Sequence, residues 1–233
     1  MIEIKVLATG SKGNCYYITD GTSPILLECG MRFRDIQKAL NFNTSSLVGC
    51  LITHEHKDHC GGLKDVLKAG INCYMSDGTA GAIGVDHHRI KKVEAKKQVT
   101  LGTWTILPFD VQHDVSEPLG FLLANQAGEK LLFATDTYYI KYRFQGLTHI
   151  MVECNYSREI LDRNIVEGRV PKVMEKRLER SHFSLENVKK FFLANDLSKV
   201  QEIWLLHLSD SNSDEEMFKR EIQELTGKLI FIP

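Results

Sequence analysis

Three histidines and an aspartate stand between residues 54 and 59. The stretch that holds them reads Thr53-His54-Glu55-His56-Lys57-Asp58-His59-Cys60-Gly61-Gly62-Leu63. Each of these groups loses hydration when it is buried, and a bound metal ion is the usual compensation. His54, His56 and Asp58 alternate, so an extended loop would point them the same way, with His59 turned to the other side. So many potential ligands within six positions indicate that this stretch forms half of a two-metal hydrolytic site, rather than a solvated loop in which histidines occur by chance.

Potential metal ligands also follow the ends of other predicted strands. An apolar run ends just before each of His113, Asp136 and His207. Because binding sites on layered sheets tend to form where strand ends meet, the repetition indicates that these side chains converge on one cleft. Two divalent ions need imidazole ligands and at least one bridging carboxylate. The chain offers a complete set for them: His54, His56, Asp58, His59, His113, Asp136 and His207.

A further carboxylate, Glu28, ends the strand predicted from Pro24 and is followed by Cys29-Gly30. It is either a satisfied strand-end group or a partner that supports the metal-binding histidines, and both interpretations stay open. Upstream, the turn-rich loop Thr9-Gly10-Ser11-Lys12-Gly13-Asn14 lacks the lysine spacing of a P-loop. A strand is predicted directly after it, where a P-loop needs a helix, so a phosphate cradle is disfavoured.

The elements that must position these residues are short apolar strands and amphipathic helices. Strands are predicted at 2–8, 15–19, 24–28, 48–52, 72–75, twice within 99–109 around Gly102, and at 119–124, 130–134, 149–153, 201–206 and 229–232. Helices are predicted at 33–42, 60–69, 77–83, from 181–184 onward and at 214–225. Because the strands fall into two groups, each followed by helices, we expect two packed sheets with helices outside. A length of 233 residues suits one large domain.

Composition excludes several classes of protein. With 43% hydrophobic and 25% charged residues, the chain can bury a sizeable core. The net charge of −1 argues against a globally basic nucleic-acid binder but leaves room for a local basic groove. No apolar run approaches the roughly 18 residues that span a bilayer, so no membrane association is expected. Residues 1–7 read as a strand rather than a signal peptide, and the six cysteines lack a C-x-x-C pair. We therefore expect reduced, mostly buried thiols and a cytoplasmic location.

Dense charge marks residues 155–180, where seven arginines and lysines alternate with five acids. This segment is either a substrate-facing insertion or a solvated helix pair, and the sequence does not separate the two. It leads into Ser181-His182-Phe183-Ser184, which starts a predicted helix. The order Ser184-Leu185-Glu186-Asn187 also fits a helix cap at that start.

The loop sequence T-H-E-H-K-D-H-C-G-G resembles the H-x-H-x-D-H signature of the metallo-β-lactamase fold. The later ligand candidates match the remaining metal motifs of that family in order, and the resemblance covers essentially the whole chain. It is strongest for the YycJ/WalJ-like branch, through Leu7 to Asn14, His113-Asp114, Ala134 to Thr137 and Ser181 to Asn187. The resemblance implies an α+β fold, a four-layer αβ/βα sandwich of two mixed sheets flanked by helices, formed as a single hydrolase domain over residues 1–233.

Carried over residue by residue, the resemblance implies two divalent metal ions, zinc or manganese, with iron as a further option. It assigns His54, His56 and His113 to the first ion, Asp58, His59 and His207 to the second, and Asp136 to the bridge. Asp58 or Asp136 would orient the nucleophile, a hydroxide shared by the two ions. Likeness to fold relatives that cut nucleic acids, such as tRNase Z, makes His182 a candidate general acid or phosphate contact. Glu28 departs from the aspartate that usually ends the first family motif.

The function that the resemblance implies is hydrolysis of phosphodiester bonds in nucleic acid, with DNA favoured over RNA, by an exonuclease of 5′-to-3′ polarity. Two other functions stay open. The same dinuclear site would also suit a thioester or lactone hydrolase, and the chain would also suit a metal-stabilised binding module without turnover. The positive segment 155–180 and His182 favour the nuclease, whereas a deep apolar pocket would favour the small-molecule hydrolase. The sequence indicates no particular protein partner.

Overall fold

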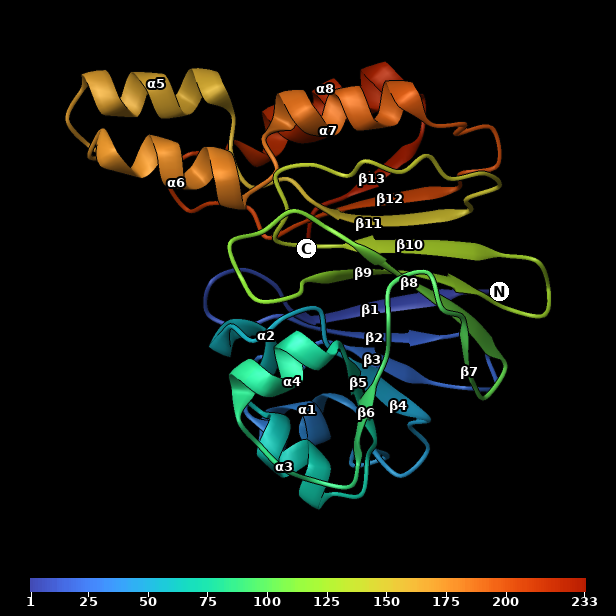
Figure 1. Ribbon diagram of the computed structural model, residues 1–233. Helices are drawn as coiled ribbons and strands as arrows, with labels where there is room; N and C mark the ends of the chain where they lie inside the picture. Colours follow the sequence, from blue (N-terminus) through green and yellow to red (C-terminus); the bar gives the residue numbers. More distant parts are fainter. The chain divides into compact units, whose positions relative to one another are not determined.

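The computed structural model describes residues 1–233, and the chain divides into two compact units. The first unit comprises Met1–Asp110 and Val115–Glu129, and the second comprises Val111–Asp114 and Lys130–Pro233. The strands belong to a six-stranded and a seven-stranded sheet, with helices beside them (Figure 1). The prediction of one hydrolase domain over residues 1–233 stays a prediction.

A mixed six-stranded sheet forms the larger part of the first unit. Its first three strands pair antiparallel, and the next three continue the sheet in parallel. Parallel strands need crossover connections, and short helices provide them. The strands are β1 (Glu3–Ala8), β2 (Cys15–Thr19), β3 (Ile25–Leu27), β4 (Gly49–Leu51), β5 (Cys73–Met75) and β6 (Ile90–Lys92). The helices are α1 (Phe33–Ala39), α2 (Lys57–Cys60), α3 (Leu63–Lys68) and α4 (Asp77–Ile83).

Two of these elements differ from the prediction. The single helix predicted at 60–69 is interrupted at Gly61-Gly62, so that α2 and α3 are separate. The strand β6 lies in a charged stretch that reads as a solvated face, and only its pairing with β5 makes it a strand. Ser76 caps α4, since its Oγ accepts a hydrogen bond from Thr79 N at 3.0 Å.

The first unit also contains an antiparallel group of β7 (Val99–Leu101), β8 (Trp104–Asp110) and β9 (Leu119–Ala124). The turn between β7 and β8 is bonded to the turn between β2 and β3. Trp104 Nε1 donates to Ser23 O at 2.6 Å, and Thr103 Oγ1 donates to the Asp20 carboxylate at 2.5 Å. These bonds fix the antiparallel group on the same unit as the six-stranded sheet.

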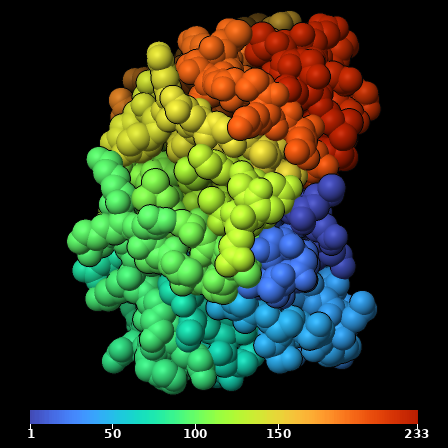
Figure 2. All heavy atoms as spheres, turned by 90° about the vertical axis from the view of Figure 1, so that its right-hand side faces the viewer, coloured from blue at the N-terminus to red at the C-terminus, as the bar shows by residue number.

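The second unit is built on four parallel strands. The first connection is a loop, and helices make the other two. The helices α7 and α8 pack together and share an ion pair between Lys189 and Glu221. Figure 2 shows the residues from α7 to the end of the chain, orange to red, beside one another on this face. The strands are β10 (Lys130–Ala134), β11 (His149–Glu153), β12 (Glu202–Leu206) and β13 (Leu229–Phe231), in that order. The helices are α5 (Arg158–Val166), α6 (Val173–Ser181), α7 (Leu185–Ala194) and α8 (Glu215–Thr226).

Residues 155–180 contain the helix pair α5 and α6. A helix pair was one of the two interpretations of the dense charge in this segment. Arg158 and Glu179 join the two helices at 2.7 Å, and Lys172 pairs with Glu175 at 2.6 Å. The helix predicted to start at Ser181 begins later, at Leu185, and Ser184 caps it by accepting from Asn187 N at 3.3 Å. His182 therefore lies in extended chain between α6 and α7.

All six cysteines are unpaired thiols and five are buried, as the sequence predicts. No helix combines the length and apolarity that crossing a bilayer demands.

Candidate metal centre

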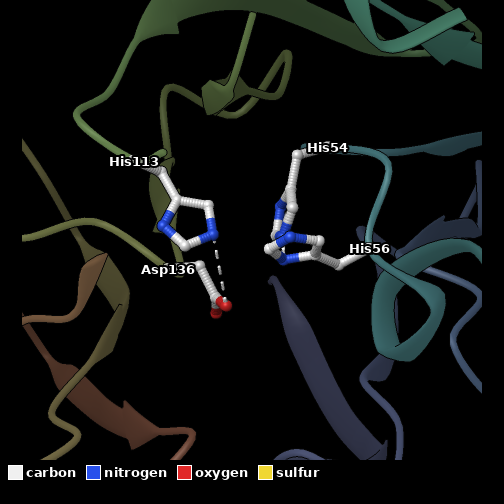
Figure 3. A group of neighbouring side chains, drawn as sticks. All are labelled: His54, His56, His113 and Asp136. Carbon is white, nitrogen blue, oxygen red and sulfur yellow. Dashed lines mark hydrogen bonds and ion pairs between the residues drawn. The ribbon is translucent and has the colours of Figure 1, made fainter. Parts of the chain in front are cut away.

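The segment after β4 carries three histidines of the first unit, His54, His56 and His59. His54 is buried, and His56 is the last extended residue before α2, with φ −62° and ψ 145°. His54 Nε2 and His56 Nδ1 lie 3.1 Å apart, and Figure 3 shows these two nitrogens facing each other. The ring centroids of His54 and His59 are 4.1 Å apart. The predicted extended loop is thus right only as far as His56, and one helical turn then brings His59 back against His54.

Asp58 and His59 are held in place by the turn-rich loop of residues 9–14. Asn14 N donates to Asp58 O at 2.7 Å, and the Asn14 side-chain amide lies 3.1 Å from His59 Nε2. His59 Nε2 is also 3.3 Å from Asp58 Oδ2. Gly30 closes this packing, since Gly30 N donates to Asn14 O at 2.8 Å. The loop of residues 9–14 therefore positions two metal-ligand candidates, Asp58 and His59.

Glu28 lies directly after β3, fully buried. Its Oε1 is 3.6 Å from His59 Nδ1, and Thr53 N donates to its two carboxylate oxygens at 3.2 and 3.3 Å. Burial raises the pKa of Glu28, and the neighbouring His59 and Thr53 only partly oppose this. Glu28 thus stands where a carboxylate that orients a metal-binding histidine would stand. That role stays a prediction.

Four potential ligands meet in the second unit at the carboxyl ends of its parallel strands. One ligand atom from each of Asp136, Glu153, His182 and His207 lies within 4.8 Å of the others. Glu153 Oε1 is 2.5 Å from His182 Nδ1 and 3.3 Å from His207 Nδ1. Asp136 Oδ1 is 3.8 Å from His207 Nδ1, and Asp136 Oδ2 is 3.9 Å from His113 Nε2 (Figure 3). Within this unit, the strand ends therefore converge as the sequence pattern predicts.

Glu153 is the member of this cluster that the sequence analysis missed. Besides its two histidine contacts, its carboxylate accepts hydrogen bonds from Thr137 N at 3.0 Å and Phe183 N at 3.1 Å. Burial would raise the pKa of Glu153, but His182 and the hydrogen bonds outweigh it and lower that pKa. Conversely, Glu153 outweighs burial and raises the pKa of His182. The signal for Glu153 was present, because β11 ends on a potential ligand just as β10 and β12 lead to one.

The hydrogen bonds of His113 favour the form that binds a metal. His113 Nδ1 is 3.0 Å from Ser181 O, and a carbonyl oxygen can only accept, so Nδ1 carries the proton. The lone pair then lies on Nε2, the nitrogen that faces Asp136. Ser181 is fixed in turn by its Oγ, which donates to Asp114 Oδ1 at 3.0 Å. His207 is held at its backbone, where Asn155 Nδ2 donates to its carbonyl oxygen at 2.8 Å.

Three of the candidate residues adopt a backbone conformation that non-glycine residues rarely take. Glu28, Asp136 and His207 have φ values of 64°, 47° and 55°. Each follows directly or nearly directly on the end of β3, β10 or β12. Such left-handed residues cost free energy, about 1 to 3 kcal/mol each, and cluster at functional sites, where surrounding contacts hold them. The sharp turn redirects the side chain at the strand end.

The two units thus present two sets of donors whose chemistry fits divalent metal ions. The first unit supplies His54, His56, Asp58 and His59, and the second supplies His113, Asp136 and His207, with Glu153 and His182 beside them. Imidazole with carboxylate suits zinc, manganese and iron. The sequence-predicted division of these residues between two ions stays a prediction.

Comparison with known proteins agrees with this reading. A family model described as Beta-lactamase superfamily domain matches residues 24–207. Exodeoxyribonuclease YycJ of Bacillus anthracis is 27% identical over 241 residues, which cover 96% of this chain and 89% of the relative. Exodeoxyribonuclease WalJ of Streptococcus pneumoniae serotype 2 is 28% identical, with coverage of 92% and 84%.

Solved structures share the fold at low sequence identity. The metallo-beta-lactamase fold protein YhfI from Bacillus subtilis has a TM-score of 0.72 at 14% identity, covering 100% of this chain and 97% of that chain. The short form of human tRNase Z has a TM-score of 0.66 at 14% identity, covering 100% and 96%. The predicted fold, two mixed sheets with flanking helices, is confirmed. The chain belongs to the beta-lactamase superfamily domain family and is a metal-dependent hydrolase of the metallo-β-lactamase fold.

Proposed function

We propose that this hydrolase cleaves phosphodiester bonds of nucleic acid and acts as a DNA exonuclease with 5′-to-3′ polarity. The observation that carries the proposal is the match to two exodeoxyribonucleases over at least 92% of this chain. The complete set of candidate ligands supports it, because a chain that had lost turnover would be expected to lack some of them. The polarity follows from the sequence resemblance to the YycJ/WalJ-like branch. The six unpaired thiols suit a cytoplasmic enzyme.

The resemblance to the family divides the candidate ligands between two ions. His54, His56 and His113 would hold one ion, Asp58, His59 and His207 the other, and Asp136 would bridge. Bound divalent ions would activate water and neutralise negative charge on a phosphoryl group. Asp58 and Asp136, as hydrogen-bond acceptors, would orient the attacking water. Glu28 and Asn14 would keep His59 in one orientation through the contacts described above.

His182 would donate the proton that the leaving oxygen needs. Its Nδ1 is bound to Glu153 at 2.5 Å, so in the imidazolium form Nε2–H is the proton left to transfer. Glu153 outweighs the effect of burial and raises the pKa of His182, which favours that protonated form. The same ring would alternatively contact a phosphate oxygen.

The proposal is tested with purified protein, manganese or zinc, and duplex DNA labelled at the 5′ or the 3′ end. Wild type should release label from the 5′ end first, and an RNA of the same sequence should be a poorer substrate. His56→Ala should be inert, whereas His88→Ala removes an exposed histidine outside both donor sets and should match wild type. Equal inactivity of wild type and His56→Ala on DNA and RNA would refute the nuclease.

The rival functions give different results in two further assays. A small-molecule hydrolase should turn over a thioester or lactone faster than bis-(p-nitrophenyl) phosphate, and a nuclease should show the reverse order. A non-catalytic module should leave every substrate intact. Metal analysis of protein purified without chelator also separates the two. Less than one ion per chain would support such a module, and about two ions per chain would support the proposed enzyme.

A further inference from the structure

A cavity of about 370 Å³ in the second unit lies outside both donor sets. Its walls come from the loop of residues 139–143, from Phe183, and from α7. Asn187, Lys190, Phe191 and Ala194 all line it, at the spacing of one helix face. We propose that this cavity binds one nucleotide of a single-stranded nucleic-acid end, which rests on the proposed function and assigns to it a substrate-binding pocket.

Aromatic rings suited to stacking on a base line the cavity. Tyr139 and Tyr142 belong to its loop wall, and Tyr139 is 54% exposed, unusual for so large a ring. Phe144 supports this wall from behind, since its ring centroid lies 6.4 Å from Tyr142 and 6.4 Å from Phe191. Phe191 packs in turn on the buried Phe183 at 6.3 Å. The supported ring of Tyr142 and the exposed ring of Tyr139 in the same wall are the kind of platform that proteins offer to unstacked bases.

The charged side chains of the cavity are all cationic. Lys141, Arg143 and Lys190 line it, and none of the lining residues is a carboxylate. Lys141 Nζ lies 5.2 Å from the centre of the Tyr142 ring, which brings charge and aromatic face together. This balance is notable in a chain whose net charge is −1. Cations beside aromatic rings suit a ligand that carries a phosphate and a flat base, which is a nucleotide.

The cavity is joined to the donor set of the second unit through short covalent and hydrogen-bonded links. Thr137 directly follows Asp136, and its Oγ1 donates to Tyr139 O at 2.9 Å. Asn187 Nδ2 donates to Tyr138 O at 3.3 Å, which fastens the loop to α7. On the other wall, Phe183 directly follows His182. Of the residues that line the pocket, Phe183 thus lies next to the proposed general acid, and Tyr139 lies three positions after the proposed bridging ligand.

The first test measures binding without catalysis. Full-length protein in excess chelator is titrated into a fluorescently labelled single-stranded oligothymidylate, and anisotropy is recorded. Tyr139→Ala should weaken binding about 5- to 150-fold, the effect of losing one stacked base. Tyr139→Phe keeps the ring and should restore binding to near the wild-type value. Phe42→Ala, which removes an exposed ring in the first unit, is the matched control and should bind as wild type does.

The second test separates the phosphate from the base. Lys190→Gln should reduce the slope of log binding constant against log salt concentration by about 0.7, the value for one phosphate contact on a single strand. Lys199→Gln, an exposed lysine outside the cavity, should leave the slope unchanged. Inorganic phosphate, thymidine and an oligouridylate serve as competitors. The oligouridylate should compete better than phosphate or thymidine. Its affinity compared with that of the oligothymidylate shows whether RNA or DNA is preferred.

The outcomes distinguish failure of the pocket from failure of the proposed nuclease. Wild-type binding by Tyr139→Ala with an unchanged salt slope in Lys190→Gln would overturn the pocket, even if the protein cuts DNA. Absence of any oligonucleotide binding by wild type would also overturn it. Ring-dependent binding by a protein that cleaves neither DNA nor RNA would support the pocket and refute the proposed nuclease. Circular dichroism and thermal melting check that each variant is folded. Because Tyr139 is exposed, its replacement should not unfold the protein.

Discussion

Gly30→Ala should disable the metal-ligand loop of the first unit without touching any ligand. A Cβ atom placed on Gly30 would lie 1.6 Å from Asp58 O and 2.9 Å from Asn14 N. Ordinary contact needs at least about 3.4 Å, so the backbone of Asp58 must move by about 1.8 Å. A displacement of about 1 Å at a reacting centre costs roughly 100-fold in rate. We therefore expect kcat/KM on DNA to fall by about 100-fold or more.

The same clash should lower stability by about 1 to 3 kcal/mol, the usual cost of overpacking. For a chain of this size, that corresponds to a fall in Tm of about 2 to 12 °C. Gly81→Ala is the matched control, because a Cβ on Gly81 meets nothing within 4 Å and the residue lies in α4. It should leave activity unchanged and raise stability slightly. Equal activity and Tm in the two variants would refute the reasoning, since only one of them carries the clash.

Two further predictions concern charged groups. Glu153→Gln should weaken metal binding about 10- to 100-fold, because the carboxylate beside His182 and His207 no longer orients these two rings. Titration calorimetry measures the metal affinity, and an unchanged affinity would contradict the prediction. Asp20→Asn tests the pH dependence of stability. Hydrogen bonds from Thr103 and Ser23 outweigh burial and lower the pKa of Asp20. The contribution of Asp20 to stability is therefore present above about pH 4 and is lost as the pH falls through its folded-state pKa. Urea unfolding should show the variant less stable at pH 7 and the difference shrinking below about pH 4; a constant difference would argue against this.

Much of the fold was predictable because strand and helix signals here are local. Apolar runs bounded by glycine or polar residues located β7 through β12 closely, and Ser184 marked the start of α7 by its capping side chain. The exceptions depend on tertiary contacts. The strand β6 is short, charged and exposed, and only pairing with β5 makes it a strand. The Gly61-Gly62 break between α2 and α3 follows from close approach to the backbone of residues 29–31.

The candidate site was predictable where ligand type and spacing coincide, as in His54 to His59. Glu153 was missed although it ends the apolar strand β11, because no histidine or second carboxylate lies beside it in the sequence. Only the structure shows that it faces His182 and His207. The role of Asn14 is hidden for the same reason, since it lies 45 residues before the His59 that it contacts. The left-handed backbone of Glu28 and Asp136 is set by surrounding contacts rather than by residue type.

The central claim is that metal ions held by these histidines and aspartates cleave nucleic acid. The most direct measurement follows end-labelled duplex DNA with protein stripped by chelator and then reloaded with manganese or zinc. The account predicts that stripped protein is inert, that reloaded wild type shortens the DNA from its 5′ end, and that reloaded His56→Ala stays inert. Reloaded wild type that leaves DNA and RNA intact, or His56→Ala that cuts as wild type does, would contradict it.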